Sequence, residues 1–194
     1  MKKLLLLASF LLSTPIFAAL WIEPFAGLGI GTSEATASAS GLNYPIKYAY
    51  SGTDYGARLG LRFLGLLAGV HYDTMKSASL KLKDASGLTG LADTKNDFTN
   101  IGVYAGYELP ILLKAWGTYY LSSRDKRSDK TVQASSGYSL GLGLRPPLPL
   151  PFISIYLNAE YRQFSYDDYS VGTIKIKDTK KKEFLMTISL PITI

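Results

Sequence analysis

The chain of 194 residues contains no cysteine and only one histidine, His71. Without cysteine it can form neither a disulfide framework nor a thiolate metal site. Its histidine and carboxylate residues nowhere show the spacing of a metal site, so we expect no metal and no cofactor. Beyond the N-terminus, no segment approaches the roughly 18–20 consecutive apolar residues of a membrane-spanning helix. One β-type domain is therefore the default for this length.

The first residues have the layout of a cleavable signal peptide. Lys2 and Lys3 precede the apolar run Leu4–Leu12, and small residues follow it. We predict a signal peptide over residues 1–18 and a mature domain over residues 19–194. No cysteine follows the apolar run, which excludes a lipoprotein. The run is short for a membrane anchor, which is the alternative interpretation.

Positive charge exceeds negative charge only moderately. The chain has 21 Lys and Arg against 15 Asp and Glu, a net charge of +6, and removal of Lys2 and Lys3 leaves +4. The basic residues are spread along the chain, whereas a nucleic-acid-binding protein concentrates them on one face. We therefore expect no nucleic-acid partner.

Apolar and polar residues alternate with a period of two in eight segments of the chain. This alternation is typical of β-strands whose two faces have different surroundings. In the first segment, for example, Leu28 and Ile30 lie on one face, and Gly27 and Gly29 lie on the other. The segments are approximately residues 20–32, 50–63, 66–74, 98–109, 113–122, 131–145, 152–164 and 183–194.

The connections between these segments alternate in length. Short turns at one end and long loops at the other describe an up-and-down meander that closes into a barrel. Two stretches inside the long loops, residues 79–84 and 173–178, alternate aliphatic residues with lysine and suit strands that extend above the barrel. The short connections are residues 64–65, 110–112 and 146–151, and the long ones are about 33–49, 75–97, 123–130 and 165–182.

The composition of the two strand faces favours a membrane barrel. A small soluble barrel packs its apolar face inside, whereas a membrane barrel directs that face to lipid and its polar face to the lumen. The polar face here is rich in glycine, which costs ~0.5–1 kcal/mol per residue relative to alanine. In a narrow lumen, glycine makes room for long side chains from opposite strands. A soluble periplasmic barrel of lipocalin type is the alternative.

The charged residues of the polar face predict an ion network in the lumen. A buried ion is costly unless it is paired, and arginine binds a carboxylate at two points. Eight strands enclose an interior that side chains can fill, so a wide pore is not expected. We expect pairing across the lumen among Glu23, Arg58, Arg62, Glu108, Lys114, Arg145, Glu160 and Arg162.

Aromatic residues gather near the ends of the apolar stretches. Rings at both membrane interfaces mark membrane barrels, although tyrosine also has a general preference for strands. The expected girdle consists of Tyr48, Tyr50, Tyr55, Tyr72, Tyr119, Tyr138, Tyr161 and Phe184.

The signal peptide, eight alternating strands, short turns and long loops together resemble the small outer-membrane barrels of the OmpA/OmpX type. The resemblance covers residues 19–194 in pattern rather than in a specific motif. It implies an all-β fold: a closed eight-stranded antiparallel up-and-down transmembrane β-barrel in the bacterial outer membrane, inserted by the barrel-assembly machinery. Such proteins usually end in an aromatic residue, whereas this chain has Pro191 near its end and finishes at Ile194.

A catalytic site is not expected. His71 and Asp73 share a strand face and suit a base with its orienting carboxylate, but no serine on that face supplies a nucleophile. A histidine hydrogen-bonded to its neighbour in the lumen is the simpler interpretation. We predict a non-enzymatic barrel that serves envelope structure or surface interaction by displaying four loops. A narrow porin-like channel and an outer-leaflet lipid-modifying enzyme are the alternatives.

Basic residues of the long loops are candidates for contact with lipopolysaccharide and the other outer-membrane lipids. A lysine-rich rim beside an anionic leaflet is attracted to it electrostatically, and a solvated loop is the alternative. The loops also suit a surface protein partner. The candidate rim residues are Arg124, Lys126, Arg127, Lys130, Lys180, Lys181 and Lys182.

Overall fold

The computed structural model describes residues 18–39, 41–84, 94–109, 112–126, 131–147, 154–171 and 173–194. The predicted signal peptide, except for Ala18, lies outside these residues and stays a prediction. The described part of the chain contains no helix that is long and apolar enough to cross a membrane.

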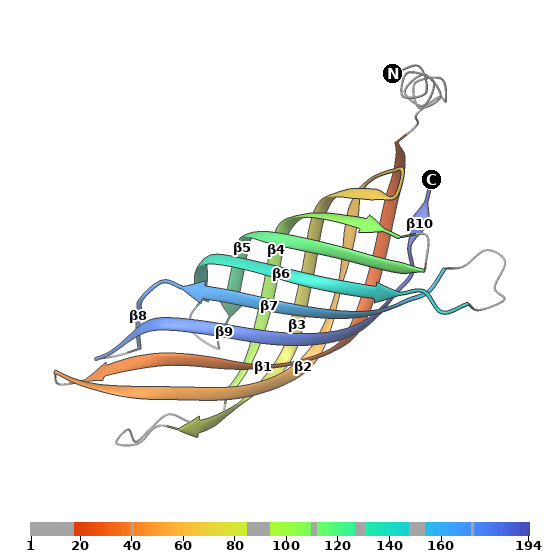
Figure 1. Ribbon diagram of the computed structural model, residues 1–194. Coiled ribbons are helices and arrows are strands. Elements are labelled where there is room, and N and C mark those ends of the chain that lie inside the picture. The colour runs from red at the N-terminus through yellow and green to blue at the C-terminus, as the bar shows by residue number, and fades with distance from the viewer. Residues whose placement is uncertain are drawn as a thin grey trace, which may run out of the picture.

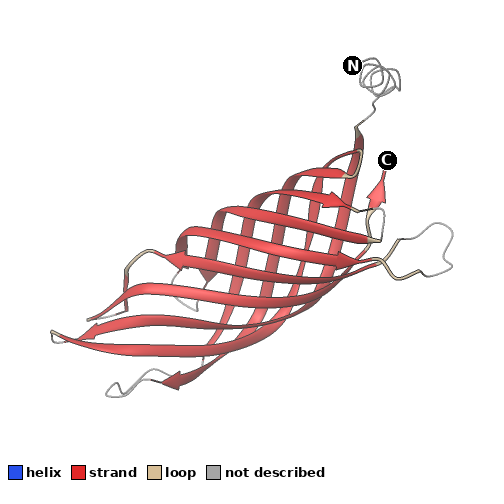
Figure 2. Cartoon of the chain, in the orientation of Figure 1, coloured by secondary structure: helices blue, strands red, loops and turns tan. Residues whose placement is uncertain are grey.

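The described chain consists almost entirely of antiparallel β-strands joined by turns (Figure 2). The alternating sequence segments form the central part of the long strands. The strands are β1 (Ala19–Ala39), β2 (Leu42–Phe63), β3 (Leu66–Asp84), β4 (Thr94–Glu108), β5 (Leu113–Lys126), β6 (Thr131–Leu144), β7 (Tyr156–Tyr166), β8 (Tyr169–Val171), β9 (Ile174–Ser189) and β10 (Ile192–Thr193).

Eight of these strands form a closed barrel (Figure 1). Each strand from β1 to β7 pairs with the next, except that β7 pairs with β9, and β9 returns to β1. The closing pairs run from Phe25↔Ser189 to Ser38↔Lys175. Closure leaves the sheet without an edge at this level, as a lipid environment requires. The predicted closed eight-stranded antiparallel up-and-down barrel is confirmed.

The strands extend well beyond the predicted segments at the end opposite the C-terminus (Figure 2). The predicted long loop 33–49 is mostly a strand hairpin, with a turn at Gly41 (φ 79°). Both lysine-containing repeats belong to these extensions, because β3 runs to Asp84 and β9 begins at Ile174. We call the extensions the crown, which comprises residues 31–39, 42–52, 76–84, 169–171 and 174–182.

The last predicted strand is divided in two. β9 ends at Ser189, and β10 then pairs with Trp21 and Ile22 of β1. Pro191 lies between them and has no N–H group to donate, which explains the break. The seventh strand begins at Tyr156, later than the predicted residue 152, which lies outside the described residues.

The barrel carries most of its large aliphatic side chains on the outside. Leu28, Leu140, Leu142 and Met186 are each between 63% and 67% exposed. A water-soluble protein rarely exposes a contiguous apolar surface of this kind, whereas a lipid-facing barrel requires one. The outer surface therefore matches the predicted inversion of the two faces.

Most of the predicted aromatic girdle faces outward at the crown end of the apolar band, but two members do not. Tyr50 is 4% exposed and packs in the lumen against Met75 and Phe98, with Tyr48 beside it. β2 continues its alternation in register with β1, so its even-numbered residues face inward. The outward members are Tyr55, Tyr72, Tyr119, Tyr138, Tyr161 and Phe184.

Some glycines of the lumen face make room for rings on neighbouring strands, whereas others, such as Gly56 and Gly60, lie closest to neighbouring backbone atoms. A Cβ atom at Gly141 would overlap with the Trp116 indole of β5. Gly29 differs, because it accommodates Met75 of β3, a strand with which β1 does not pair. The expectation that glycine serves side chains from distant strands therefore fits Gly29 but not Gly141. Neighbouring strands lie only about 4.8 Å apart, so a large ring covers the next strand.

Replacing Gly141 by leucine should destabilise the barrel, because the new side chain competes with the Trp116 indole for space. Overpacking of this kind costs ~1–3 kcal/mol of unfolding free energy. Urea unfolding in lipid vesicles, followed by gel mobility, measures the change. Leu142→Phe is the control, because it adds bulk on the lipid face of the next residue. A Gly141→Leu variant with unchanged stability would contradict this packing.

Candidate functional site: the lumen network and the outer rim

Ion pairs tie opposite walls of the barrel together through the middle of the lumen. Arg58 of β2 lies 3.3 Å from Glu23 Oε1 on β1 and 2.8 Å from Glu160 Oε2 on β7. Each of the three side chains is at most 3% exposed. β2 and β7 are three strands apart around the ring, so Arg58 crosses the lumen.

Arg162 of β7 is the most highly coordinated residue of the lumen. Its Nε donates to Glu160 Oε1 at 2.9 Å, its Nη1 to Asp73 Oδ1 at 2.9 Å, and its Nη2 to Asp54 Oδ2 at 3.2 Å. Glu183 Oε2 lies 3.9 Å from Nη1. Four carboxylates, from β2, β3, β7 and β9, therefore surround one buried guanidinium group. Charge-assisted bonds of this geometry are the strong ones in proteins.

The network ends in a lysine on each side, and each ammonium group lies against aromatic rings. Lys114 Nζ donates to Glu23 Oε1 at 2.5 Å on the short-turn side. Lys181 pairs with Glu183 on the crown side, where its Nζ lies 3.1 Å from the Phe98 ring centroid. The rings within 4.5–5.5 Å of Lys114 Nζ belong to Trp21, Trp116 and Tyr156.

His71 is an enclosed member of this interior. Its Nε2 lies 2.7 Å from Asp73 Oδ2, and neither side chain is exposed. Asp73 Oδ1 also accepts a hydrogen bond from Asn100 Nδ2 at 2.7 Å. The imidazole lies between Phe25 and Tyr120, with ring centroids 5.5 and 5.7 Å away. The pair therefore has the geometry of a base with its orienting carboxylate, but the folded lumen encloses it.

The structure brings five of the eight predicted network residues together in the middle of the lumen: Glu23, Arg58, Lys114, Glu160 and Arg162. The other three lie nearer the short turns. There, Arg62 Nη2 pairs with Glu108 Oε2 at 2.8 Å, and Arg145 lines the same cavity.

Sequence reasoning missed four residues that complete the network. Asp54 and Glu183 lie on lumen-facing positions of β2 and β9, and strand parity could have identified both. Asp73 was placed on the right face but not assigned to the network. Lys181, predicted on the outer rim, is 2% exposed and points into the lumen. It lies between two outward lysines, so strict alternation turns it inward. The lumen network comprises Glu23, Asp54, Arg58, Asp73, Lys114, Glu160, Arg162, Lys181 and Glu183.

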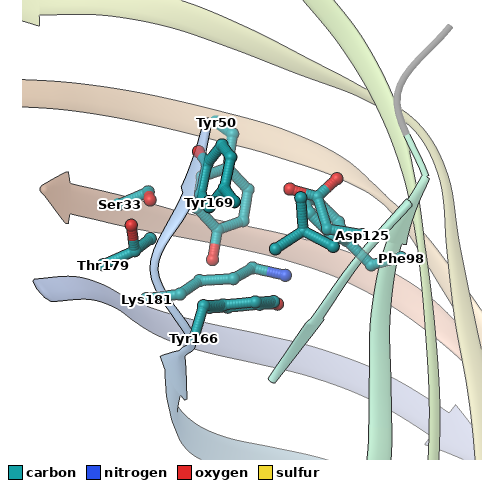
Figure 3. Close-up of a pocket in the computed structure, with 9 residues that line it drawn as sticks. Ser33, Tyr50, Phe98, Asp125, Tyr166, Tyr169, Thr179 and Lys181 are labelled. Carbon is teal, nitrogen blue, oxygen red and sulfur yellow. The ribbon is translucent and has the colours of Figure 1, made fainter. Parts of the chain in front are cut away.

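Two small cavities flank the lumen network. The crown-side cavity has a volume of about 10 Å³, and the short-turn cavity has about 40 Å³. Figure 3 shows Lys181 extending across the crown-side cavity between the Tyr50 and Tyr166 rings, toward Phe98 and Asp125. A single water molecule needs roughly 10–15 Å³, so these spaces hold a few water molecules at most.

A column of exposed lysines runs up the outer face of β9, and we call it the β9 lysine column. At the end of the column nearest the apolar band, Lys182 lies opposite Thr32 of β1 and Gln163 of β7. Its members are Lys175, Lys177, Lys180 and Lys182.

One carboxylate beside the column, Glu34, is paired with a lysine outside it. Glu34 lies opposite Lys180, but Lys47 Nζ donates to Glu34 Oε1 at 2.6 Å and lowers the pKa of Glu34. Elsewhere on the crown, Asp97 pairs with Lys76 at 3.0 Å and raises the pKa of Lys76.

Arg124 and Lys126, two further predicted rim residues, lie on a different strand from the β9 lysine column. Arg124 and Lys126 are exposed on β5, where Arg124 pairs in register with Thr99 and Gln133. Arg127 and Lys130 lie outside the described residues.

Replacing Arg162 by methionine should cost ~3–5 kcal/mol of unfolding free energy, because it leaves buried carboxylates without their cation. Urea unfolding of the barrel in lipid vesicles measures the loss. Arg124→Met removes an exposed arginine of the same length and should change stability little. A loss for Arg162→Met as small as that of Arg124→Met would contradict the network.

Comparisons with known proteins agree with this architecture. The family model described as "Outer membrane protein beta-barrel domain" matches residues 4–177. OprG from Pseudomonas aeruginosa is 11% identical, with 90% of this chain and 97% of that chain covered at a TM-score of 0.53. Ail from Yersinia pestis is 12% identical, with 87% and 98% covered at 0.38. The neisserial surface protein NspA is 15% identical, with 86% and 96% covered at 0.36.

No curated protein matches the chain in sequence. OprG shares little identity with it, so that similarity speaks for the fold alone. The family match covers most of the chain and agrees with the closed eight-stranded ring and its apolar outer surface. The chain therefore belongs to the outer-membrane β-barrel domain family, and the protein resides in the bacterial outer membrane.

Proposed function

We propose that the protein is a non-conducting outer-membrane barrel that works through its outer rim, by binding lipopolysaccharide and presenting the crown to a surface partner. One observation carries this proposal: the lumen network removes the charged groups of the barrel interior from solvent. The accessible chemistry of the described chain then lies on the crown and the barrel ends.

The buried ion pairs of the lumen support a barrel that does not conduct ions. Arg58 and Arg162 cross its middle and are each 1% exposed. A passing ion would have to separate buried pairs and lose its own hydration, which is costly in a low-dielectric interior. The two flanking cavities, with room for only a few waters, lie on either side of this barrier.

The packing of the crown supports its proposed role of presenting a surface to a protein partner. Ala37, Ile46 and Ile176 form a small apolar core on its inner side, and each is at most 4% exposed. Partly buried Tyr169 packs against this core. Leu42 stands at the turn of the β1–β2 hairpin and is 60% exposed. A packed base with an exposed apolar tip supports contact with a protein partner at the cell surface.

The β9 lysine column supports binding of lipopolysaccharide. Lys182 and Lys180 lie two and four residues beyond the outward ring of Phe184, which is ~7 and ~13 Å along the strand. Aromatic girdles lie at the membrane interface, so these lysines reach the level of lipid phosphate groups. Each lysine near an anionic surface contributes ~1 kcal/mol. Insertion by the barrel-assembly machinery is part of the same proposal.

A catalytic role is not part of this proposal. His71 and Asp73 are fully buried, and Asp73 is held by Arg162 and Asn100 as well as by His71. A substrate would have to displace these contacts before it reached the imidazole.

In planar bilayers, the unchanged protein should show no conductance steps. Removing one crossing pair with Arg58→Ala and Glu160→Ala should open a path and produce leakage, because both side chains leave together and no lone charge remains. Arg62→Ala with Glu108→Ala is the matched control, since that pair lies at the barrel end and leaves the middle network closed. Steady channel activity of the unchanged protein would contradict the proposal.

The Lys180→Gln and Lys182→Gln double variant should bind lipopolysaccharide ~30-fold more weakly, because two contributions of ~1 kcal/mol are lost. Affinity is measured on barrels in vesicles titrated with lipopolysaccharide at low salt, where screening is weakest. Lys47→Gln with Lys76→Gln is the control, since both lysines are exposed on the crown but paired with carboxylates. Equal losses in the two double variants would overturn the assignment to β9.

A further inference from the structure

The short-turn end of the lumen holds a cavity that the proposed function does not use. Its volume is about 40 Å³. Three cationic side chains line it: Arg62 of β2, Lys114 of β5, and Arg145, which directly follows β6. A single carboxylate, Glu108 of β4, faces them across the cavity. The lining is therefore rich in positive charge.

The carboxylates within reach are already engaged. Glu108 pairs with Arg62 at 2.8 Å and also accepts a hydrogen bond from the Tyr156 hydroxyl. Glu23, the partner of Lys114, is shared with Arg58. Within the described residues, Arg145 makes no ion pair. Among the residues that the structure describes, no side-chain carboxylate therefore pairs with the Arg145 guanidinium group.

The remaining lining adds donors and a path from solvent. Ser154 and Thr193 also line the cavity, and a serine or threonine hydroxyl can donate to an anion. The Arg62 side chain is 39% exposed, so the cavity is reached from the barrel end. About 40 Å³ accommodates roughly three water molecules at 10–15 Å³ each. That space suits one small anionic group and excludes a sugar ring or a folded peptide.

We propose that this cavity is an anion site that binds one carboxylate or phosphate group from the periplasmic side. Short turns mark that side of a membrane barrel. The planar guanidinium group of Arg145 presents parallel N–H donors that match two oxygens of either group. Thr193 belongs to β10, which pairs with β1, so an occupied site also ties the C-terminal segment to the barrel end.

Phosphate can reach this site as a free ion or as the headgroup of an inner-leaflet lipid, and two environments distinguish these sources. The full barrel is titrated with inorganic phosphate by calorimetry, first in maltoside micelles, which contain no phosphate, and then in phosphatidylglycerol vesicles. We expect saturable binding of one phosphate per barrel in micelles. Equal binding in vesicles identifies a free anion, whereas binding lost in vesicles identifies the lipid headgroup.

Arg145→Gln should weaken phosphate binding in micelles by about tenfold or more, and Arg145→Lys by less, because lysine keeps the charge but lacks the planar fork. Arg124→Gln removes the same charge from the crown side and should leave binding unchanged. Heat-dependent gel mobility verifies that each variant is folded. The absence of saturable phosphate binding in micelles, or equal affinity of Arg145→Gln and the unchanged protein, would overturn the proposal.

Discussion

The guanidinium group of Arg162, surrounded by carboxylates from four strands, is the interaction on which the rest of this barrel depends. A closed ring of eight strands has an interior too narrow for bulk water, and its outer face must be apolar in lipid. The polar side chains then have no place but the lumen, where each ion is costly unless paired. Arg58 and Arg162 meet that requirement by binding carboxylates on strands far apart in the ring. The same pairs hold opposite walls of the barrel together.

This interior also determines where the protein can act. Its middle is occupied by paired ions, so both proposed binding sites lie at the ends of the barrel. At the crown end, strand extensions pack a small apolar core around Ile46 and Ile176 and carry the β9 lysine column on the outside. At the opposite end, Arg145 leaves positive charge in a small cavity. The two proposals therefore assign different chemistry to the two ends, a broad basic surface at the crown and a site for one anionic group at the short turns.

The period-two pattern predicts the barrel, the inversion of its faces and the lumen positions of Glu23, Arg58, Glu160 and Arg162, because alternation follows from backbone geometry alone. It does not predict which residues meet, since that depends on the stagger between strands around the ring. Asp54 and Glu183 were missed although parity alone places both in the lumen. Apart from the two lysine-containing stretches, the crown was interpreted as loops because its outer face lacks large apolar residues, although its backbone pairing continues from Gly31↔Tyr50 to Ala39↔Leu42. Lys181 was misplaced because a run of lysines resembles a solvated surface.

Spin labels on single introduced cysteines test the central claim directly, because the chain has no cysteine of its own. Labels at Leu140 and Leu142 should collide freely with oxygen dissolved in the lipid and be shielded from a water-soluble nickel reagent. Labels at Ser139 and Asn158 should be shielded from both, since these positions lie in the filled lumen. The contradicting result is that labels at Leu140 and Leu142 are shielded from the lipid while labels at Ser139 and Asn158 are exposed to water. That result would rule out an interior filled by paired ions.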